Sequence, residues 1–180
     1  MEVLAMKLGR EEISEIVKSH MKSVGYDTRD WTVEIVLQKF NRKVEDENRT
    51  EVSIPFYQRE FVWNDEQIAR LVETILLGLP LPLIFLEQTQ TCMFEIIDGS
   101  QRIRALDKFF RNEKKLCKLK ILEKLNGLKF GDLPSAVQRQ LNNYSLRIIV
   151  LQPRGEDEAD IAANCLTELI QAEQIPHAWS

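Results

Sequence analysis

Residues suited to phosphate chemistry lie together at the end of an apolar run, in the sequence EIIDGSQRIRAL (residues 95–106). The run ends at Asp98 and Gly99, and Arg102 and Arg104 follow shortly after. If a helix begins after Gly99, its first turn offers unpaired backbone N–H groups and the positive end of the helix dipole to an anion. Glycine lets that backbone approach a ligand closely, and arginine can donate paired hydrogen bonds to phosphate oxygens. The segment therefore predicts a phosphate-binding loop.

The polar side chains of this segment suggest a division of roles. Asp98 can hold a divalent metal ion such as Mg²⁺ or a water molecule, and Gln101 can orient a nucleophile. Arg102 and Arg104 can neutralise phosphate charge. Asp98, Gln101 and Arg102 are thus the candidate catalytic residues. The alternative is structural, and the local pattern alone favours it, because a strand–glycine–helix junction with a surface arginine is more often part of a fold than a site.

The flanking sequence predicts the elements that position this loop. The apolar runs PLPLIFLEQ and TCMFEIID, joined by residues 88–91, predict a β-hairpin whose second strand ends at Asp98. A helix is predicted from about Ser100 to Asn112. Further helices are predicted over residues 10–24, after Thr32, after Asn64 and after Pro134, and further strands at EVSI and SLRIIVLQ. Because helices and strands mix without regular alternation, the sequence predicts an α+β fold.

Residues with strong positional preferences mark the ends of two of these helices. Thr32 is a candidate N-cap for the helix that follows it. Asn64 with Gln67 has the spacing of a capping box, and Gly78 is a natural stop for the helix that begins there.

Composition limits the classes of function. With 180 residues and 44% hydrophobic content, we expect one well-buried domain with an appendage. The few cysteines and histidines are too scattered for a metal site or a catalytic Cys/His pair, which argues against zinc and thiol catalysis. They are Cys92, Cys117, Cys165, His20 and His177. Without a leader sequence or an apolar run of roughly 20 residues, the chain is expected to be cytoplasmic.

A basic segment follows the predicted loop. Residues 99–124 contain nine lysines and arginines against three acidic residues. This excess could face DNA, although the net charge of −4 for the whole chain argues against a general grip on nucleic acid. A solvated helix surface is the alternative, and the acidic remainder of the chain favours it.

Aromatic residues are frequent in the sequence IPFYQREFVW. Phe56, Phe61 and Trp63 are predicted to pack in the core or against a strand rather than to stack on a base. Arg59, next to Tyr57, has two interpretations: a functional cation, or a cation that only stacks on an aromatic surface.

Two sequence blocks resemble the N-terminal domain of GmrSD-type modification-dependent restriction proteins, whose hallmark is Asp-Gly-Gln-Gln-Arg. They are IPFYQREFVWNDEQIARLVETILLGLPLPLIFLEQ and EIIDGSQRIRALDKFF. The resemblance runs over residues 31–163 and includes LNGLKFGDLPSAVQRQLNNYSLRIIVL. Ser100 replaces the commoner first glutamine. This change leaves Arg102 and the phosphate-binding backbone of the loop intact, but the role of the side chain at position 100 stays open.

This family is similar to the ParB and sulfiredoxin group, in which a Gly-Glu-Arg-Arg-x-Arg-Ala type loop holds nucleotide phosphates. The spacing of that loop is kept here by Gly99, Arg102, Arg104 and Ala105. Gln58 and Arg59 take the place of the group's upstream Gln-Pro-Arg. The resemblance therefore implies a ParB/sulfiredoxin-like fold and a nucleotide site shared between the two blocks. Sulfiredoxin activity itself is excluded, because that chemistry needs a cysteine in the loop.

The resemblance implies a domain that binds and hydrolyses a nucleoside triphosphate, with a divalent metal such as Mg²⁺, to license a DNA-cutting domain in defence against phage. Its partners would be the nucleotide, DNA through residues 99–124, and a nuclease domain or subunit. The alternative is a non-catalytic DNA- or partner-binding module, or an inactive truncated fragment. A domain that itself cuts nucleic acid is a weaker idea, because no His-Asn-His cluster is present.

The C-terminal residues depart from the family. After DEADIAA, relatives are expected to continue with Leu-Phe-Asp-Arg-Ile-Asn-Thr-Gly-Gly-Thr, whereas this chain continues with NCLTELIQAEQ. A set of codons for residues 164–174 gives that expected sequence when it is read from its third base. We therefore predict a frameshift near Asn164. The predicted organisation is a helical extension over residues 1–30, the GmrSD-type domain over 31–163 and a non-family tail over 164–180.

Overall fold

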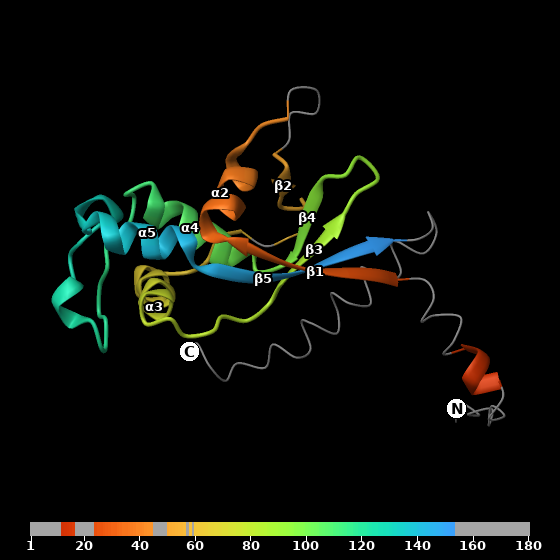
Figure 1. Ribbon diagram of the computed structural model, residues 1–180, viewed down its shortest axis with the longest axis horizontal. Helices are drawn as coiled ribbons and strands as arrows, with labels where there is room; N and C mark the ends of the chain where they lie inside the picture. The colour runs from red at the N-terminus through yellow and green to blue at the C-terminus, as the bar shows by residue number, and fades with distance from the viewer. Residues whose placement is uncertain (1–11, 17–23, 45–49, 57, 59, 154–180) are drawn as a thin grey trace, which may run out of the picture.

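The computed structural model describes residues 12–16, 24–44, 50–56, 58 and 60–153. Its centre is a five-stranded mixed sheet in the order β1-β5-β3-β4-β2 (Figure 1). The strands are β1 (Val24–Thr32), β2 (Val52–Ser53), β3 (Ile84–Gln88), β4 (Phe94–Asp98) and β5 (Ser145–Pro153). The α+β fold class predicted from the sequence is confirmed.

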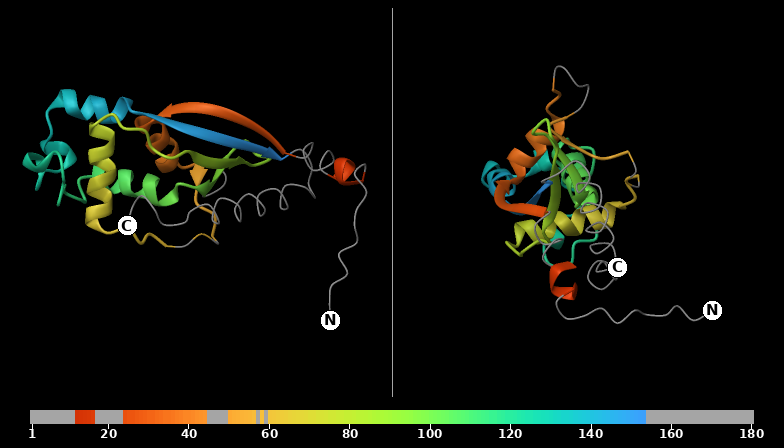
Figure 2. Two further views of the ribbon diagram at one scale, coloured as in Figure 1. Left: turned by 90° about the horizontal axis from the view of Figure 1, so that it is seen from below. Right: turned by 90° about the vertical axis from the view of Figure 1, so that its right-hand side faces the viewer.

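Besides the short helical stretch at residues 12–16, the described chain contains the helices α2 (Val33–Asn41), α3 (Asp65–Leu76), α4 (Ser100–Phe110) and α5 (Ser135–Asn143). Two short 3₁₀ turns, η1 (Glu123–Leu125) and η2 (Phe130–Asp132), lie in the long connection between α4 and α5. Helices α3, α4 and α5 gather at one end of the elongated molecule, and the long β1–β5 ribbon extends toward the other end (Figures 1 and 2). Within the described ranges, no helix is long and apolar enough to cross a membrane.

The pairing of the strands sets the position of the predicted loop. Strands β3 and β4 form the predicted antiparallel hairpin, while β3 pairs in parallel with β5 and β4 pairs in parallel with the short β2. The core side chains of the sheet are almost completely buried, among them Ile84, Leu86, Ile96, Ile148 and Val150. Strand β4 is therefore an interior strand, and its last residue, Asp98, lies at a fixed point beside the core.

The predicted helix starts are confirmed in detail. The Thr32 hydroxyl accepts a hydrogen bond from the N–H of Ile35 at 3.3 Å, which caps α2. Asn64 and Gln67 form a complete capping box, with bonds of 2.9 and 3.0 Å in opposite directions. Gly78 follows α3 with a φ of +68°, a left-handed conformation that glycine adopts without strain.

Strand β1 was not predicted, and it corrects only the last residue, Val24, of the helix expected over residues 10–24. Residues 12–16 are helical, but Val24 begins a nine-residue strand that pairs antiparallel with β5 along its whole length. The outward-facing residues of β1 are exposed and polar or aromatic, such as Tyr26, so the strand lacks the apolar alternation that marks a half-buried strand. Its stability comes from the ladder to β5, which a local pattern does not reveal.

Candidate functional site

The junction between β4 and α4 has the geometry predicted for the phosphate loop. Asp98 ends β4, and Gly99 is the N-cap of α4 with a φ of +99°. A β-carbon on Gly99 would lie 3.0 Å from Cγ1 of the buried Ile84. Because glycine has no side chain, no side-chain hydrogen bond caps this helix. The first-turn N–H groups of α4 thus have no side-chain cap, and the residues that carry the start of the helix, Gly99, Ser100 and Gln101, are buried.

Arg102 lies beside Gly99 and ties the junction together. Its Nη2 donates to Oδ2 of Asp98 at 2.8 Å and to the carbonyl of Leu83 at 2.9 Å, and its Nη1 donates to the carbonyl of Pro82. The side chain is only 12% exposed. Burial lowers the pKa of Arg102, and the Asp98 carboxylate opposes that shift. An arginine stays protonated near neutral pH, so a positive charge is fixed at the start of α4.

Three of the five N–H groups that a guanidinium offers are thus used within the protein. Arg102 has a structural role that the sequence did not reveal, because its acceptors include backbone carbonyls of the segment before β3. Arg102 lies next to Gly99, and its contact with a phosphate stays a prediction.

Gln101 is one of three polar or charged residues that are buried in the described chain, with 7% of its surface exposed. Its Oε1 accepts from the N–H of Val62 at 3.0 Å, and its Nε2 donates to the carbonyl of Glu60 at 3.0 Å. Both ends of the amide are therefore engaged with the segment that precedes α3.

Gln58 contacts the same junction from the other sequence block. Its Nε2 donates to the carbonyl of Ile97 at 3.0 Å and to that of Ile96. The two blocks that resemble the GmrSD-type domain are therefore brought together, as a shared site requires. Arg59 lies outside the described residues, so its predicted convergence with Arg102 stays a prediction.

The remaining predicted site residues occupy the first turns of α4. Ser100 is buried, and Arg104 is half-buried. Within the described chain, the Arg104 side chain has no hydrogen bond or ion pair. No described partner therefore neutralises the charge of Arg104, which lies about one helical turn after Ser100.

A divalent metal bound at Asp98 would need further ligands around that carboxylate. One oxygen of its carboxylate accepts from Arg102. Among the described residues, no group of three or more His, Cys, Asp or Glu side chains could hold a metal ion. The protein side chains alone do not form a metal centre here, and a Mg²⁺ ion bound through Asp98 stays a prediction from the sequence.

The aromatic residues near the junction divide into two groups. Phe61 and Trp63 are partly buried and pack against the core, as predicted. Phe56 is 99% exposed, so the prediction that it packs in the core or against a strand is wrong. The apolar pattern IPF suggested burial, but β2 ends at Ser53 and Phe56 lies beyond the strand.

A matched pair of substitutions checks this difference in burial. Phe56→Ser is expected to change the free energy of unfolding by no more than about 0.5 kcal/mol, because an exposed ring loses little on truncation. Phe61→Ser is expected to cost about 1–3 kcal/mol, because it removes a ring that packs against the core. Urea denaturation of both variants measures the difference, and an equal cost would contradict the assignment.

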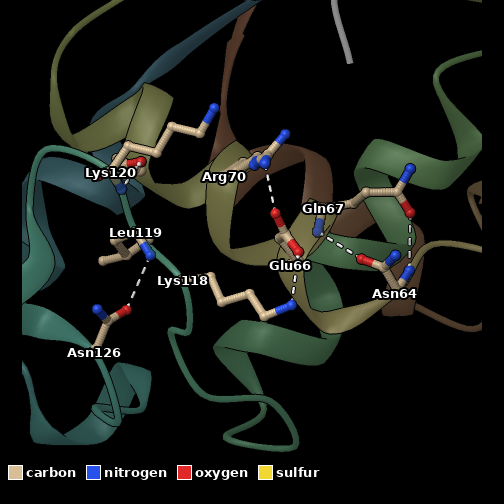
Figure 3. A network of polar contacts seen from close by, with 9 residues as sticks. Asn64, Glu66, Gln67, Arg70, Lys118, Leu119, Lys120 and Asn126 are labelled. Atoms are coloured by element: carbon tan, nitrogen blue, oxygen red, sulfur yellow. Dashed lines mark hydrogen bonds and ion pairs between the residues drawn. The ribbon is translucent and has the colours of Figure 1, made fainter. Parts of the chain in front are cut away.

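The basic side chains of residues 99–124 are partly neutralised by carboxylates in the fold. Five of its nine basic side chains form ion pairs with carboxylates. These are Arg102, Lys108, Arg111, Lys114 and Lys118. Figure 3 shows Lys118 and Arg70 on either side of Glu66, a residue of α3. The acidic start of α3 thus offsets part of the excess charge, which favours the interpretation as a solvated surface over a DNA-binding face.

Glu73 is a buried carboxylate that the sequence did not single out. It is 6% exposed and accepts hydrogen bonds from the backbone N–H groups of Lys120, Ile121 and Leu122 at 3.3, 2.8 and 2.8 Å. Burial acts to raise the pKa of Glu73, but the three N–H donors and the charge of Arg70 outweigh it, so the pKa lies below its usual value. Glu73 therefore fastens the lysine-rich connection onto α3.

The fold and the site define an α+β domain in which an interior strand delivers a left-handed glycine and a buried arginine to an uncapped helix start. The family model of the GmrSD restriction endonuclease N-terminal domain matches residues 37–169. Because this range covers most of the chain, the chain belongs to that family, and the resemblance seen in the sequence is confirmed. A comparison with curated proteins finds no match. The predicted domain limits and the frameshift stay predictions, since residues 154–180 lie outside the described part of the chain.

Proposed function

We propose that this chain is a nucleoside-triphosphate-binding and hydrolysing domain that regulates a modification-dependent DNA restriction system. Its family is the N-terminal domain of restriction endonucleases, which supports the restriction system. The observation that supports the nucleotide is the start of α4, where no side chain caps the helix and Gly99 has a left-handed backbone, the arrangement that suits an anion at a helix N-terminus.

Different groups of the β4–α4 junction would bind the phosphates in different ways. The N–H groups of the first turn of α4 would donate to phosphate oxygens, and the fixed charge of Arg102 would stabilise negative charge beside them. Arg104, two residues further along α4, points about 200° away from Arg102 around the helix, so it would contact a different part of the nucleotide. Such an arrangement stabilises a phosphoryl group chiefly by position and electrostatics, which is the main requirement of phosphoryl transfer.

A divalent metal would supply charge neutralisation on the phosphates of the bound nucleotide. Since the described side chains offer Asp98 alone, most of its ligands would come from the nucleotide and water. The proposed roles of the backbone and of the arginines do not depend on the metal. A DNA contact through residues 99–124 and a partner nuclease are further proposals that follow from the family.

Arg104→Gln tests the proposal with little risk to folding, because the side chain makes no hydrogen bond or ion pair within the described chain. We expect the wild-type chain to bind and hydrolyse at least one nucleoside triphosphate. The variant should bind it about 10- to 100-fold more weakly, the effect of a lost hydrogen bond to a charged group.

The matched control is Arg139→Gln, which removes one exposed arginine from α5. Calorimetric titration with each of the common triphosphates, with and without DNA, gives the affinities, and phosphate release gives the turnover. Absence of binding by the wild-type chain under all these conditions would leave the non-catalytic binding module as the better interpretation. Equal weakening in both variants would show a general charge effect.

A further inference from the structure

We propose that Gln58 and Gln101 are positioning residues, whose side-chain amides hold residues 58 and 60–63 against the β4–α4 junction, beside the proposed nucleotide site. This inference rests on the proposed function of the junction. It replaces the role first predicted for Gln101, that of orienting a nucleophile, with a role exerted through the neighbouring segment.

Gln101 holds the segment at two points. Its amide accepts from the N–H of Val62 and donates to the carbonyl of Glu60, both at 3.0 Å. These two backbone groups lie on either side of Phe61, so the side chain serves the segment as a residue of a neighbouring strand would. Gln101 is only 7% exposed, whereas Glu60 and Val62 are exposed, so these two bonds fasten an exposed stretch of backbone to a buried side chain.

Gln58 supplies a third point of attachment from within the segment. Its amide nitrogen donates to the carbonyls of Ile96 and Ile97 at the end of β4, and its own N–H donates to the carbonyl of Pro55 at 3.1 Å. The attachments at Gln58 and Glu60 bracket Arg59 in the sequence. Arg59 itself lies outside the described residues, so the clamp consists of the contacts that Gln58 makes with the end of β4 and that Gln101 makes with Glu60 and Val62.

Glutamine suits this position because one amide is both donor and acceptor in a planar group. An ionised glutamate at position 101 could still accept from Val62 but would face the carbonyl of Glu60 with a second acceptor. A protonated glutamic acid, in contrast, has one donor and one acceptor and nearly the shape of glutamine. The clamp hypothesis therefore predicts that Gln101→Glu regains function on protonation.

Hydrogen exchange and nucleotide titration of the full chain together test the clamp. In Gln101→Leu, and in Gln101→Glu at about pH 8, amide exchange of residues 58–62 should accelerate at least about tenfold while the strands β3–β5 stay protected. Affinity for the nucleoside triphosphate should fall by about tenfold or more, with a smaller change in kcat. In Gln101→Glu both effects should diminish as the pH falls to about 5.5, because burial raises the pKa of a carboxyl group.

The control is Gln140→Leu on α5. This substitution removes a hydrogen bond that the Gln140 side chain donates to the carbonyl of Leu76. It should change neither exchange in segment 55–63 nor affinity. Unchanged exchange of residues 58–62 in Gln101→Leu would overturn the clamp, and a loss of kcat alone in that case would return Gln101 to direct catalysis. If Gln101→Leu does not fold, the pH response of Gln101→Glu decides. Because exchange is measured without nucleotide, failure of the clamp and failure of the proposed function remain distinguishable.

Discussion

Replacing Glu73 with alanine is expected to lower the free energy of unfolding by about 2–4 kcal/mol, because three backbone N–H groups lose the buried carboxylate that they share as an acceptor. The carboxylate of Glu73 is the point at which α3 holds the connection at residues 120–122. Residues 120–122 belong to neither a helix nor a strand, so no regular backbone hydrogen bonding replaces the bonds to Glu73. Denaturant unfolding followed by circular dichroism measures the cost.

The same carboxylate gives the stability a dependence on pH. The pKa of Glu73 in the folded protein lies below its unfolded value, so its contribution is complete above the unfolded pKa and is lost as the pH falls through the folded pKa. Wild-type stability should therefore decrease on acidification below about pH 5, and Glu73→Gln should reduce that slope. Glu123→Gln, at an exposed position on η1, is the matched control. Parallel pH profiles for the two variants would contradict the assignment to Glu73.

Elements with a local signal were predictable from the sequence. The caps at Thr32 and Asn64 are local hydrogen bonds between a side chain and a nearby N–H group, so short-range spacing is enough to find them. The junction at Gly99 was predictable for the same reason, because an apolar run followed by Asp-Gly and a helical period fixes a strand end and a helix start within a few residues.

Features that depend on distant partners were not predictable. Strand β1 forms because β5, more than a hundred residues later, pairs with it. The acceptors of Arg102 at Pro82 and Leu83 are backbone carbonyls, which carry no residue-specific signal. The sequence could show that Gln101 belongs to a polar motif, but only the fold shows that its amide meets Glu60 and Val62.

The structure therefore changes the interpretation of the motif more than its location. In the sequence, Asp98, Gln101 and Arg102 form a row of candidate catalytic groups. In the fold, each is joined to a neighbouring segment: Arg102 to Asp98 and to the segment before β3, and Gln101 to the segment before α3. Since a well-defined site needs support for the groups that touch the ligand, these bonds are the means by which a phosphate cradle can be preorganised.

Gly99→Ala is expected to lower the free energy of unfolding by about 2–5 kcal/mol, since the new methyl group adds backbone strain and a steric clash. The φ of +99° at Gly99 is strained for any residue with a β-carbon. That carbon would also lie 3.0 and 3.3 Å from the two γ-carbons of Ile84, and 3.4 Å from Nη2 of Arg102. Ile84 is 1% exposed and lies in the close-packed core, which resists the shift that the new methyl group demands.

Gly78→Ala separates the two causes. Gly78 also has a positive φ, +68°, but a β-carbon there would meet nothing within 4 Å, so only the backbone strain of about 1 kcal/mol should appear. The difference between the two variants in urea denaturation therefore reports the cost of crowding Ile84 and Arg102 together with the larger backbone strain at a φ of +99°. If the cradle is as close-packed as these distances indicate, Gly99→Ala should also weaken nucleotide binding at a temperature where it is fully folded, whereas Gly78→Ala should not. Equal stability losses in the two variants would mean that the junction yields without cost, and that Gly99 is needed only for its backbone conformation.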